Sequence, residues 1–535
     1  MAASNARATS STDWRLHLPR APELLFTPLP LAALAAAALA LPASAAGRHT
    51  QPAPDAPDRP WRPNITANGE IVPGSPSPTS AASTGFVLPT NEALATLPAE
   101  PSIDRTRVYD LADLIDLAES RSPATRVAWN AARETALAAG IARSSYLPRL
   151  TATALGGFQA VHGRASALGL NAGSDNSVGG GVAALSLQWL LFDFGQRRAI
   201  VEGADQATIA ADIGFTAAHQ ALIHQVSLAF YAHAAARSRT ASATRSLADA
   251  QAVQQAAEQR YQHGVGTVIE VAQAKQATAQ ARLAEVQAKG ATEDAYVDLL
   301  AVMGIPPLTK IAIADASGHR LSPALGDDAE KVIASALGRR PDVLAAYASL
   351  KASLAGERAA RAEFLPKFFV SANGAYAGGD LSLSGLPSIG SGDSPTLNLT
   401  NRRLGATIVG GVTVPLYDGG RRKAALEQAR TRTDSARATL DRVRNDAIQQ
   451  MVVANNALRT SLAAHEAAGE LQAAAQTTFD AALAAYRNGV GSSTDVMLAE
   501  RQLLEARNAH SDAYSTALAA AATLALASGV LGGAP

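Results

Sequence analysis

Apolar and polar residues alternate along four short segments of the chain. The segments cover residues 150–158, 185–191, 368–376 and 408–416. In the first, the even positions from Leu150 to Phe158 are apolar or small, and Thr151 and Thr153 lie between them. Such alternation predicts strands, either in a half-buried sheet or in a membrane with lipid on one face and water on the other. Each segment is close to the length of about ten residues that a tilted strand needs to cross a bilayer.

Four strands are too few to close a barrel, because the smallest natural single-chain barrels have about eight. An open sheet edge is not tolerated in lipid. The sheet is therefore either an ordinary soluble one or one completed by strands from several copies of the chain. Gly-rich and Ser-rich segments at 160–178 and 378–401 are expected to be loops that join the strands. They favour the second alternative, because membrane hairpins carry long external loops.

Apolar residues at spacings of three and four predict long helices elsewhere. The chain has no Pro between Gly195 and His263, nor between Gly420 and Asn488. Each of these stretches predicts a helix of roughly 100 Å if it is continuous. Return helices are expected at about 267–303 and 493–528, and shorter helices at about 123–143 and 341–361.

The pattern of strands and helices occurs twice. Residues 261–271 and 486–496 have similar sequences and lie 225 positions apart, and in both a pair of glycines interrupts an Ala-rich helical stretch. Glycine permits the chain to reverse there, so each stretch is the tip of a helical hairpin. The sequence predicts a first repeat at 108–320, with a β-hairpin at about 148–193 and a tip near 264, and a second repeat at 321–535, with a β-hairpin at about 366–418 and a tip near 489. Between the halves, residues 310–313 are a candidate short strand, and helical sequence resumes near Asp327.

The first hundred residues predict export and then a linker. Arginines precede a short apolar run, and small residues at 43–45 offer a cleavage point, so residues 1–45 are expected to be a signal peptide. Residues 46–107 are rich in Pro, Ser and Thr, and such a composition buries too little apolar surface to offset the entropy of ordering. This segment is expected to be a linker or tail, or alternatively to line a groove of a partner.

Composition argues against several classes of function. The chain has no Cys and a formal net charge of zero, which excludes disulfides and thiolate metal sites and gives no reason to expect a nucleic-acid partner. His219, His224 and His233 are spaced by five and nine residues, so one helix face does not bring all three to a metal. No catalytic residue, metal site or cofactor is expected, and the protein is not expected to be an enzyme.

The ordered set of motifs resembles the TolC family of outer-membrane efflux and secretion channels. It comprises the Leu-Pro strand entries at 147–148 and 365–366, the strand exits at 193–195 and 418–420, and both Gly-Val-Gly tips. The resemblance implies a mixed fold, in which long α-helical hairpins form a periplasmic α-barrel and four transmembrane β-strands per chain close as a twelve-stranded β-barrel in a homotrimer. It also implies that a periplasmic adaptor (membrane fusion protein) docks on the tips and that an inner-membrane pump of the RND or ABC type drives transport.

The same resemblance suggests site residues. Asp495 matches an aspartate that forms an acidic ring at the periplasmic gate, Tyr486 matches a latch tyrosine, and Glu270 stands where the acidic partner of that tyrosine lies. The family's second aspartate falls on Leu498 and its latch arginine on Gly491, so we expect a weaker or differently built closed state. The residues suggested for adaptor binding at the tips are Gly264, Val265, Gly266, Gly489, Val490 and Gly491. The alternatives are that these glycines only form the turns and that Asp495 and Glu270 only stabilise helix N-termini.

The sequence therefore predicts an outer-membrane channel, the exit duct of a tripartite efflux or type I secretion system, with its helical part in the periplasm and outer-membrane lipid around its strands. The alternative is a periplasmic coiled-coil adaptor of such a pump, which would carry one helical hairpin rather than two repeats. The transported substrate cannot be read from the sequence.

Overall fold

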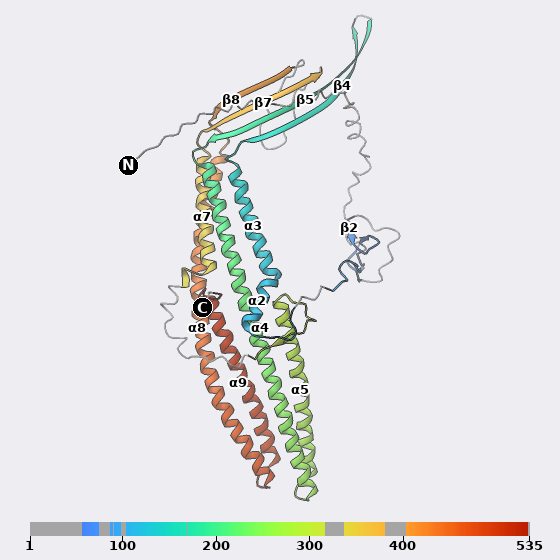
Figure 1. Ribbon diagram of the computed structural model, residues 1–535, viewed down its shortest axis with the longest axis vertical. Coiled ribbons are helices and arrows are strands. Elements are labelled where there is room, and N and C mark those ends of the chain that lie inside the picture. Colours follow the sequence, from blue (N-terminus) through green and yellow to red (C-terminus); the bar gives the residue numbers. More distant parts are fainter. Residues whose placement is uncertain are drawn as a thin grey trace, which may run out of the picture. The chain divides into compact units, whose positions relative to one another are not determined.

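The structure, a computed structural model, describes residues 56–61, 63–73, 86–88, 90–97, 103–167, 170–315, 336–379 and 403–532 (Figure 1). The chain divides into two compact units. The strand unit comprises Met1–Leu94, Leu150–Ser186 and Ala372–Thr407, and the helical unit comprises Ala95–Arg149, Leu187–Ser371 and Ile408–Pro535. The expected signal peptide at 1–45 and the expected helix start near Asp327 lie outside the described residues.

The helical unit contains two long hairpins. Hairpin one is α4 (Gln196–Gln262) and α5 (Val268–Val302), and hairpin two is α8 (Arg421–Arg487) and α9 (Ser493–Ala527). Both α4 and α8 have 67 residues, and both α5 and α9 have 35. The long helices predicted from the absence of Pro are therefore present, with ends within one or two residues of those expected.

Shorter helices pack on the upper part of the long ones (Figure 1). These are α2 (Leu111–Arg121), α3 (Pro123–Ser144) and α7 (Pro341–Ala362). Both α3 and α7 begin with Pro, which suits a first helical turn because its missing N–H would be unpaired there anyway. The contacts run in the order α3, α4, α7, α8, so α3 and α8 are the two outer helices of this layer.

An Asp–Arg clasp starts α4. The Asp193 carboxylate accepts hydrogen bonds from the backbone N–H of Arg197 and from its Nε, both at 2.9 Å. The same guanidinium donates to the carbonyl oxygens of Ser145, Leu190 and Leu191. The Asp193 and Arg197 side chains are 7% and 9% exposed, so the clasp is a buried ion pair whose hydrogen bonds are satisfied.

A second clasp starts α8 in the same way. Asp418 accepts from the backbone N–H of Arg422 at 3.0 Å and from its Nε at 2.7 Å, and the guanidinium also donates to the carbonyl of Pro415. The residue before each helix, Gly195 or Gly420, has a φ of 92° or 89°, a left-handed conformation that favours glycine. The strand exits noted in the sequence are therefore Asp-x-Gly-x-Arg clasps.

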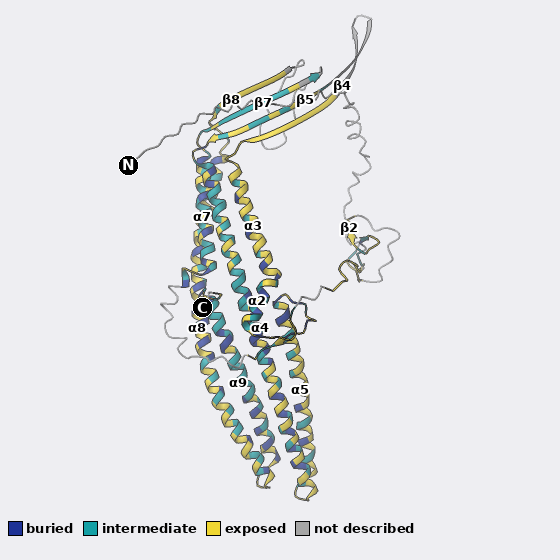
Figure 2. Ribbon diagram, viewed as in Figure 1, coloured by how far each residue is buried: buried dark blue, intermediate teal, exposed yellow. Residues whose placement is uncertain are grey.

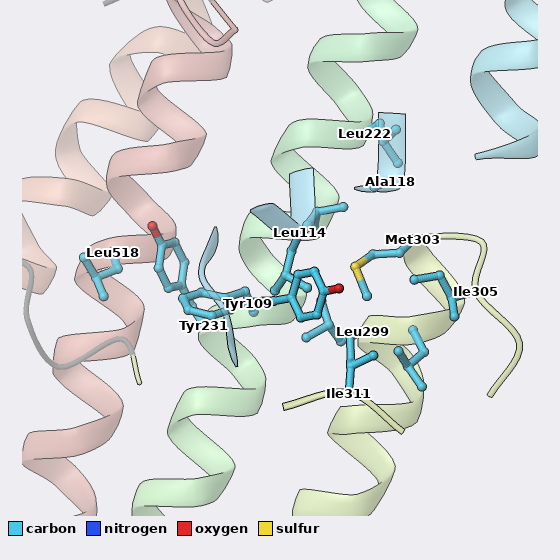
Figure 3. Packing of buried hydrophobic residues seen from close by; sticks show 13 residues of the cluster. Tyr109, Leu114, Ala118, Leu222, Tyr231, Leu299, Met303, Ile305, Ile311 and Leu518 are labelled. Carbon is cyan, nitrogen blue, oxygen red and sulfur yellow. The ribbon is translucent and has the colours of Figure 1, made fainter. Parts of the chain in front are cut away.

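The largest core cluster lies where α2, α4, α5 and α9 meet (Figure 3). Leu114, Val226, Leu299 and Met303 are among its fully buried side chains. Two short strands border it, β3 (Val108–Tyr109) and β6 (Ala312–Ile313), which pair in parallel. The short strand predicted at 310–313 is thus present. Along the hairpins, buried residues alternate with intermediate and exposed ones (Figure 2).

The sheet has four strands in the order β4-β5-β7-β8. Their bounds are Arg149–Ala167 for β4, Leu170–Phe192 for β5, Lys367–Gly379 for β7 and Arg403–Thr413 for β8. Large apolar side chains are exposed along the strands, including Leu150 at 62%, Leu404 at 81% and Ile408 at 79%. β4 and β8 each have one edge without a partner strand in the described part of the chain.

The prediction of a loop at 160–178 is wrong. β4 and β5 continue through this Gly-rich and Ser-rich stretch as far as Ala167 and from Leu170. Composition misled the prediction, because hydrogen bonding to the neighbouring strand satisfies the backbone there whatever the side chains are. The other expected loop, 378–401, lies almost entirely outside the described residues.

The segment expected to be a linker contains a small hairpin. β1 (Asn64–Ile65) pairs antiparallel with β2 (Ile71–Val72), and Gly69 makes the turn with a φ of 80°. A Cβ on Gly69 would lie 2.1 Å from the Thr90 carbonyl oxygen, so the chain packs closely there. The Pro-rich composition did not predict this local order.

Among the described residues, none of the helices combines the length and the apolar composition needed to cross a membrane.

Candidate functional site

The two hairpin tips have the same backbone turn. Gly264 and Gly489 have φ values of 75° and 81°, and Gly266 and Gly491 donate backbone hydrogen bonds to carbonyls near the end of the preceding helix. These bonds satisfy carbonyl groups that would otherwise be unpaired at a helix C-terminus. A Cβ added at Gly266 would lie 2.9 Å from the Tyr261 nitrogen, so the second glycine is required by space and the first by conformation.

Both tips expose apolar side chains, among them Val265, Val268 and Ile269 on hairpin one and Val490 on hairpin two. Val265 is 66% exposed and Val490 is 83% exposed. Apolar side chains this exposed at a turn contribute little to the core, and they are accessible to a partner. The structure thus gives the glycines a turn-forming role and leaves the valines as the candidate contact residues.

The two acidic residues predicted for the gate both lie in the first turn of a helix and contact its N-cap residue. The Ser492 hydroxyl donates to the Asp495 carboxylate at 2.7 Å and accepts from the Asp495 backbone N–H. Thr267 and Glu270 form a reciprocal capping box at the start of α5. Each carboxylate also lies in the first turn of its helix, where the helix dipole favours negative charge by about 0.3–1 kcal/mol. Both carboxylates are therefore placed to stabilise a helix N-terminus, and a gate role stays a proposal.

Tyr486 is the largest fully buried side chain of the described residues. It packs in a cluster with Val253, Phe479, Val496 and Leu503, which joins the lower parts of α4, α8 and α9. Its hydroxyl has no hydrogen-bond partner within the described part of the chain. Burial raises the pKa of Tyr486, and the Glu270 carboxylate adds to this rise. Since the Tyr486 hydroxyl has no partner among the described residues, its pairing with Glu270 stays a prediction.

Arg260 is the residue that the sequence analysis missed. Its guanidinium lies over the Tyr486 ring, 4.9 Å from the centroid, and Nη1 donates to the Tyr486 carbonyl oxygen at 3.1 Å. Nη2 donates to the carbonyl oxygen of Val265 at 3.3 Å. Arg260 therefore joins the two tips. A signal was available, because the equivalent position in the second repeat is Ala485 and the difference breaks the match between the repeats.

Replacing Arg260 with Met should loosen the contact between the tips. The variant loses a charged hydrogen bond, worth about 1.5–3 kcal/mol, and the contact with the Tyr486 ring. We expect faster amide hydrogen exchange at the end of α8. Arg487→Met removes an exposed arginine from the next position after Tyr486 and is the control. Equal exchange in the two variants would show that Arg260 does not hold the tips together.

A second region of contact between the hairpins is the seam, defined as the antiparallel packing of α4 against α9. Its polar pairs include the hydroxyls of Ser238 and Ser511, 2.7 Å apart, and the Arg239 guanidinium with the Asp512 carboxylate at 2.8 Å. Further along, His224 meets Thr523 at 3.1 Å. The packing of α4 against α9 therefore combines these polar pairs with the apolar cluster around Tyr486.

The three histidines considered as ligands have separate partners. His219 lies 3.2 Å from a Glu119 oxygen, His224 contacts Thr523, and His233 is buried beside Tyr296. Burial lowers the pKa of His224 and His233, so both are neutral at pH 7. In the described ranges, His, Cys, Asp and Glu nowhere gather in a group of three able to hold a metal ion.

Comparison with known proteins identifies the family. The model of the outer membrane efflux protein family matches residues 114–305 and 332–530. The chain belongs to this family. Protein CyaE of Bordetella pertussis is 30% identical over 415 residues, which cover 77% of this chain and 82% of CyaE. Outer membrane protein OprJ of Pseudomonas aeruginosa is 28% identical over 311 residues, covering 58% of this chain and 61% of OprJ.

Solved structures show the same fold. The outer membrane protein VceC of Vibrio cholerae has a TM-score of 0.65 at 23% identity, covering 78% of this chain and 96% of VceC. The resemblance to the TolC family is thus confirmed, and the protein is an outer-membrane efflux-type channel whose helical part is periplasmic. This is a family of channels rather than of enzymes.

Proposed function

We propose that the protein is the exit duct of a tripartite efflux or type I secretion system and works as a homotrimer. Substrates pass through it passively, delivered by an inner-membrane pump through a periplasmic adaptor. The family match over both halves supports a channel and gives no support to the adaptor alternative. The two halves, 108–320 and 321–535, are in this proposal structural repeats, consistent with the equal lengths of α4 and α8.

The observation that carries the trimer proposal is the pair of unpartnered strand edges. β4 and β8 are the outer strands of the sheet, and their apolar side chains are exposed. Unpaired edges are not tolerated in lipid, so β8 of one copy must pair with β4 of the next. Three copies supply twelve strands, which exceeds the minimum of about eight for a closed barrel. In the same way, the outer helix α8 of one copy can pack against the outer helix α3 of the next.

The tips are the proposed docking site for the adaptor, with Val265 and Val490 as the exposed anchors. A groove of about 760 Å³ lies between the two tips, lined among others by Gln259, His263 and Arg487. Its polar and basic lining, with the exposed Val265, suits the end of an adaptor helical hairpin with apolar and acidic side chains.

Asp495 is the proposed gate residue. Three copies of this exposed carboxylate, one from each chain, would form an acidic ring that attracts cations and repels anions. The ring would raise the cost of bringing the three tips together, because like charges disfavour one another. Tyr486 and Glu270 would hold the closed arrangement through the tip packing.

Single-channel recording in a planar bilayer tests this proposal. The purified protein should form cation-selective channels of trimeric mass, and both Asp495→Ala and Asp495→Asn should lose cation selectivity. Asp495→Asn is the sharper variant because Asn keeps an oxygen that can accept the Ser492 hydrogen bond. If Asp495→Asn behaves like the wild type, the carboxylate only caps α9. A monomeric protein without openings would overturn the channel proposal itself.

A further inference from the structure

One acidic side chain of the seam makes no ion pair with a cationic residue in the described part of the chain. Glu500 projects from α9 toward α4, where its carboxylate accepts a short hydrogen bond from the Ser246 hydroxyl. It is half-buried and lines a groove of about 570 Å³ between α5 and α9. Among the described residues Glu500 makes no ion pair.

The charges around Glu500 explain why it stays unpaired. Arg507, on the same helix, donates to the Asp249 carboxylate of α4 at 3.1 Å and to Gln476 of α8 at 2.8 Å. The guanidinium that could neutralise Glu500 is therefore held by Asp249, itself a second negative charge near Glu500. The residues of α5 that line the groove are uncharged, and the polar ones are Gln273, Gln276 and Gln280. Arg501, also on the groove, lies beside the exposed Glu505 at 3.9 Å.

This setting favours the protonated carboxyl. Burial raises the pKa of Glu500 and the Asp249 charge adds to the rise, whereas the Ser246 hydrogen bond and Arg507 oppose it. If α9 separated from α4, Glu500 would be solvated and would return toward its ordinary pKa. The packed seam therefore binds a proton more tightly than the separated one. By linkage, packing of the seam is strengthened as pH falls and weakened as pH rises through the raised pKa.

We propose that Glu500 is a proton-responsive contact between the two hairpins, so that acidification favours the packed seam and closes the periplasmic end of the duct. The inference rests on the proposed function, because it takes hairpin separation as the opening movement. Protonation removes both the cost of a buried charge and the repulsion by Asp249, and it leaves Ser246 and the Arg507 contacts in place. Glu500 acts by positioning α9 and does not itself contact the transported molecule.

The experiment compares wild type, Glu500→Gln and Glu505→Gln in two measurements between about pH 5 and pH 8. In planar bilayers, the open probability of the wild type should fall several-fold at the acidic end. The side chain of Glu500→Gln is neutral at every pH, so this variant should show the low open probability throughout. Glu505→Gln removes an exposed carboxylate five residues further along α9, and its open probability should depend on pH as that of the wild type does.

Thermal unfolding gives a readout that does not need a working channel. Glu500→Gln should be more stable than the wild type at the alkaline end, and the difference should vanish at the acidic end. A wild-type pH response in Glu500→Gln, or equal stability of the two at every pH, overturns the inference. If no variant opens but the stability difference appears, the contact is proton-responsive and it is the proposed duct that fails.

Discussion

The double variant Ser238→Cys/Ser511→Cys is expected to lock the two hairpins together and to abolish channel opening until a reductant is added. The two hydroxyl oxygens lie 2.7 Å apart across the seam. With Cβ–Oγ bonds of about 1.4 Å, this contact puts the two Cβ atoms at most about 5.5 Å apart, so an approach of the two helices by one to two ångström or less brings them to the roughly 3.5–4.5 Å of a disulfide. The wild-type chain has no cysteine, and the introduced pair therefore has no competing partner within the chain.

The expected size of the effect follows from the nature of the bond. The native seam is held by contacts such as the Arg239–Asp512 ion pair, which is partly exposed and worth at most about 1 kcal/mol. A covalent bond cannot be opened by thermal fluctuation, so every opening that requires α9 to leave α4 is lost. Single-channel recording before and after addition of dithiothreitol measures this directly.

Each single cysteine variant is the control, since it removes the Ser–Ser hydrogen bond without forming the intrachain disulfide. Thiol titration of the denatured double variant establishes that the bond has formed. Full conductance in the oxidised double variant would mean that the seam stays packed while the channel opens. In that case the opening movement would be confined to the tips.

The long helices were predictable because their signals are local. Pro and Gly mark helix ends within a few residues, and the absence of Pro between Gly195 and His263 was enough to predict α4. The tip turns were predictable as well, because each needs a positive φ, which glycine adopts readily at Gly264 and Gly489. The stretch at 160–178 failed for the opposite reason, because pairing with a neighbouring strand is a long-range interaction that overrides the composition of the segment.

The site could be predicted only where it depends on neighbours in sequence. Ser492 and Asp495 at the start of α9 are only three residues apart, so their contact could be predicted from the sequence. Arg260 and Tyr486 are separated by 226 residues, and Ser246 and Glu500 by 254. A single sequence does not show which helix face meets which across such distances. The seam, and with it the unpaired state of Glu500, required the packed structure.

The Asp-x-Gly-x-Arg clasps allow a comparison within one chain. Arg197→Met is expected to destabilise the helical unit by about 3–5 kcal/mol, because it leaves the Asp193 carboxylate buried without its charge partner. The three carbonyl groups of Ser145, Leu190 and Leu191 also lose a donor. Thermal unfolding followed by far-UV circular dichroism measures the loss.

Arg422→Met is the matched variant at the second clasp, and it should destabilise the helical unit less than Arg197→Met does. Besides Asp418, Arg422 donates to one carbonyl within the described ranges, that of Pro415. The Asp418 side chain is 23% exposed against 7% for Asp193. Solvent can therefore rehydrate Asp418 more easily than Asp193. Arg437→Met, which removes an exposed pair with Asp434, should change stability by less than about 1 kcal/mol.

The order of these three effects distinguishes burial from charge pairing as the source of stability. Each of the three arginines lies within 3 Å of a carboxylate. If charge pairing alone mattered, the three Arg→Met substitutions would therefore destabilise the protein by similar amounts. If burial decides, the losses follow the exposure of the carboxylate left behind. Adding Asp193→Leu to Arg197→Met should then recover part of the loss. Recovery would stay incomplete, because Asp193 also accepts the backbone N–H groups of Gly195 and Arg197 that begin α4.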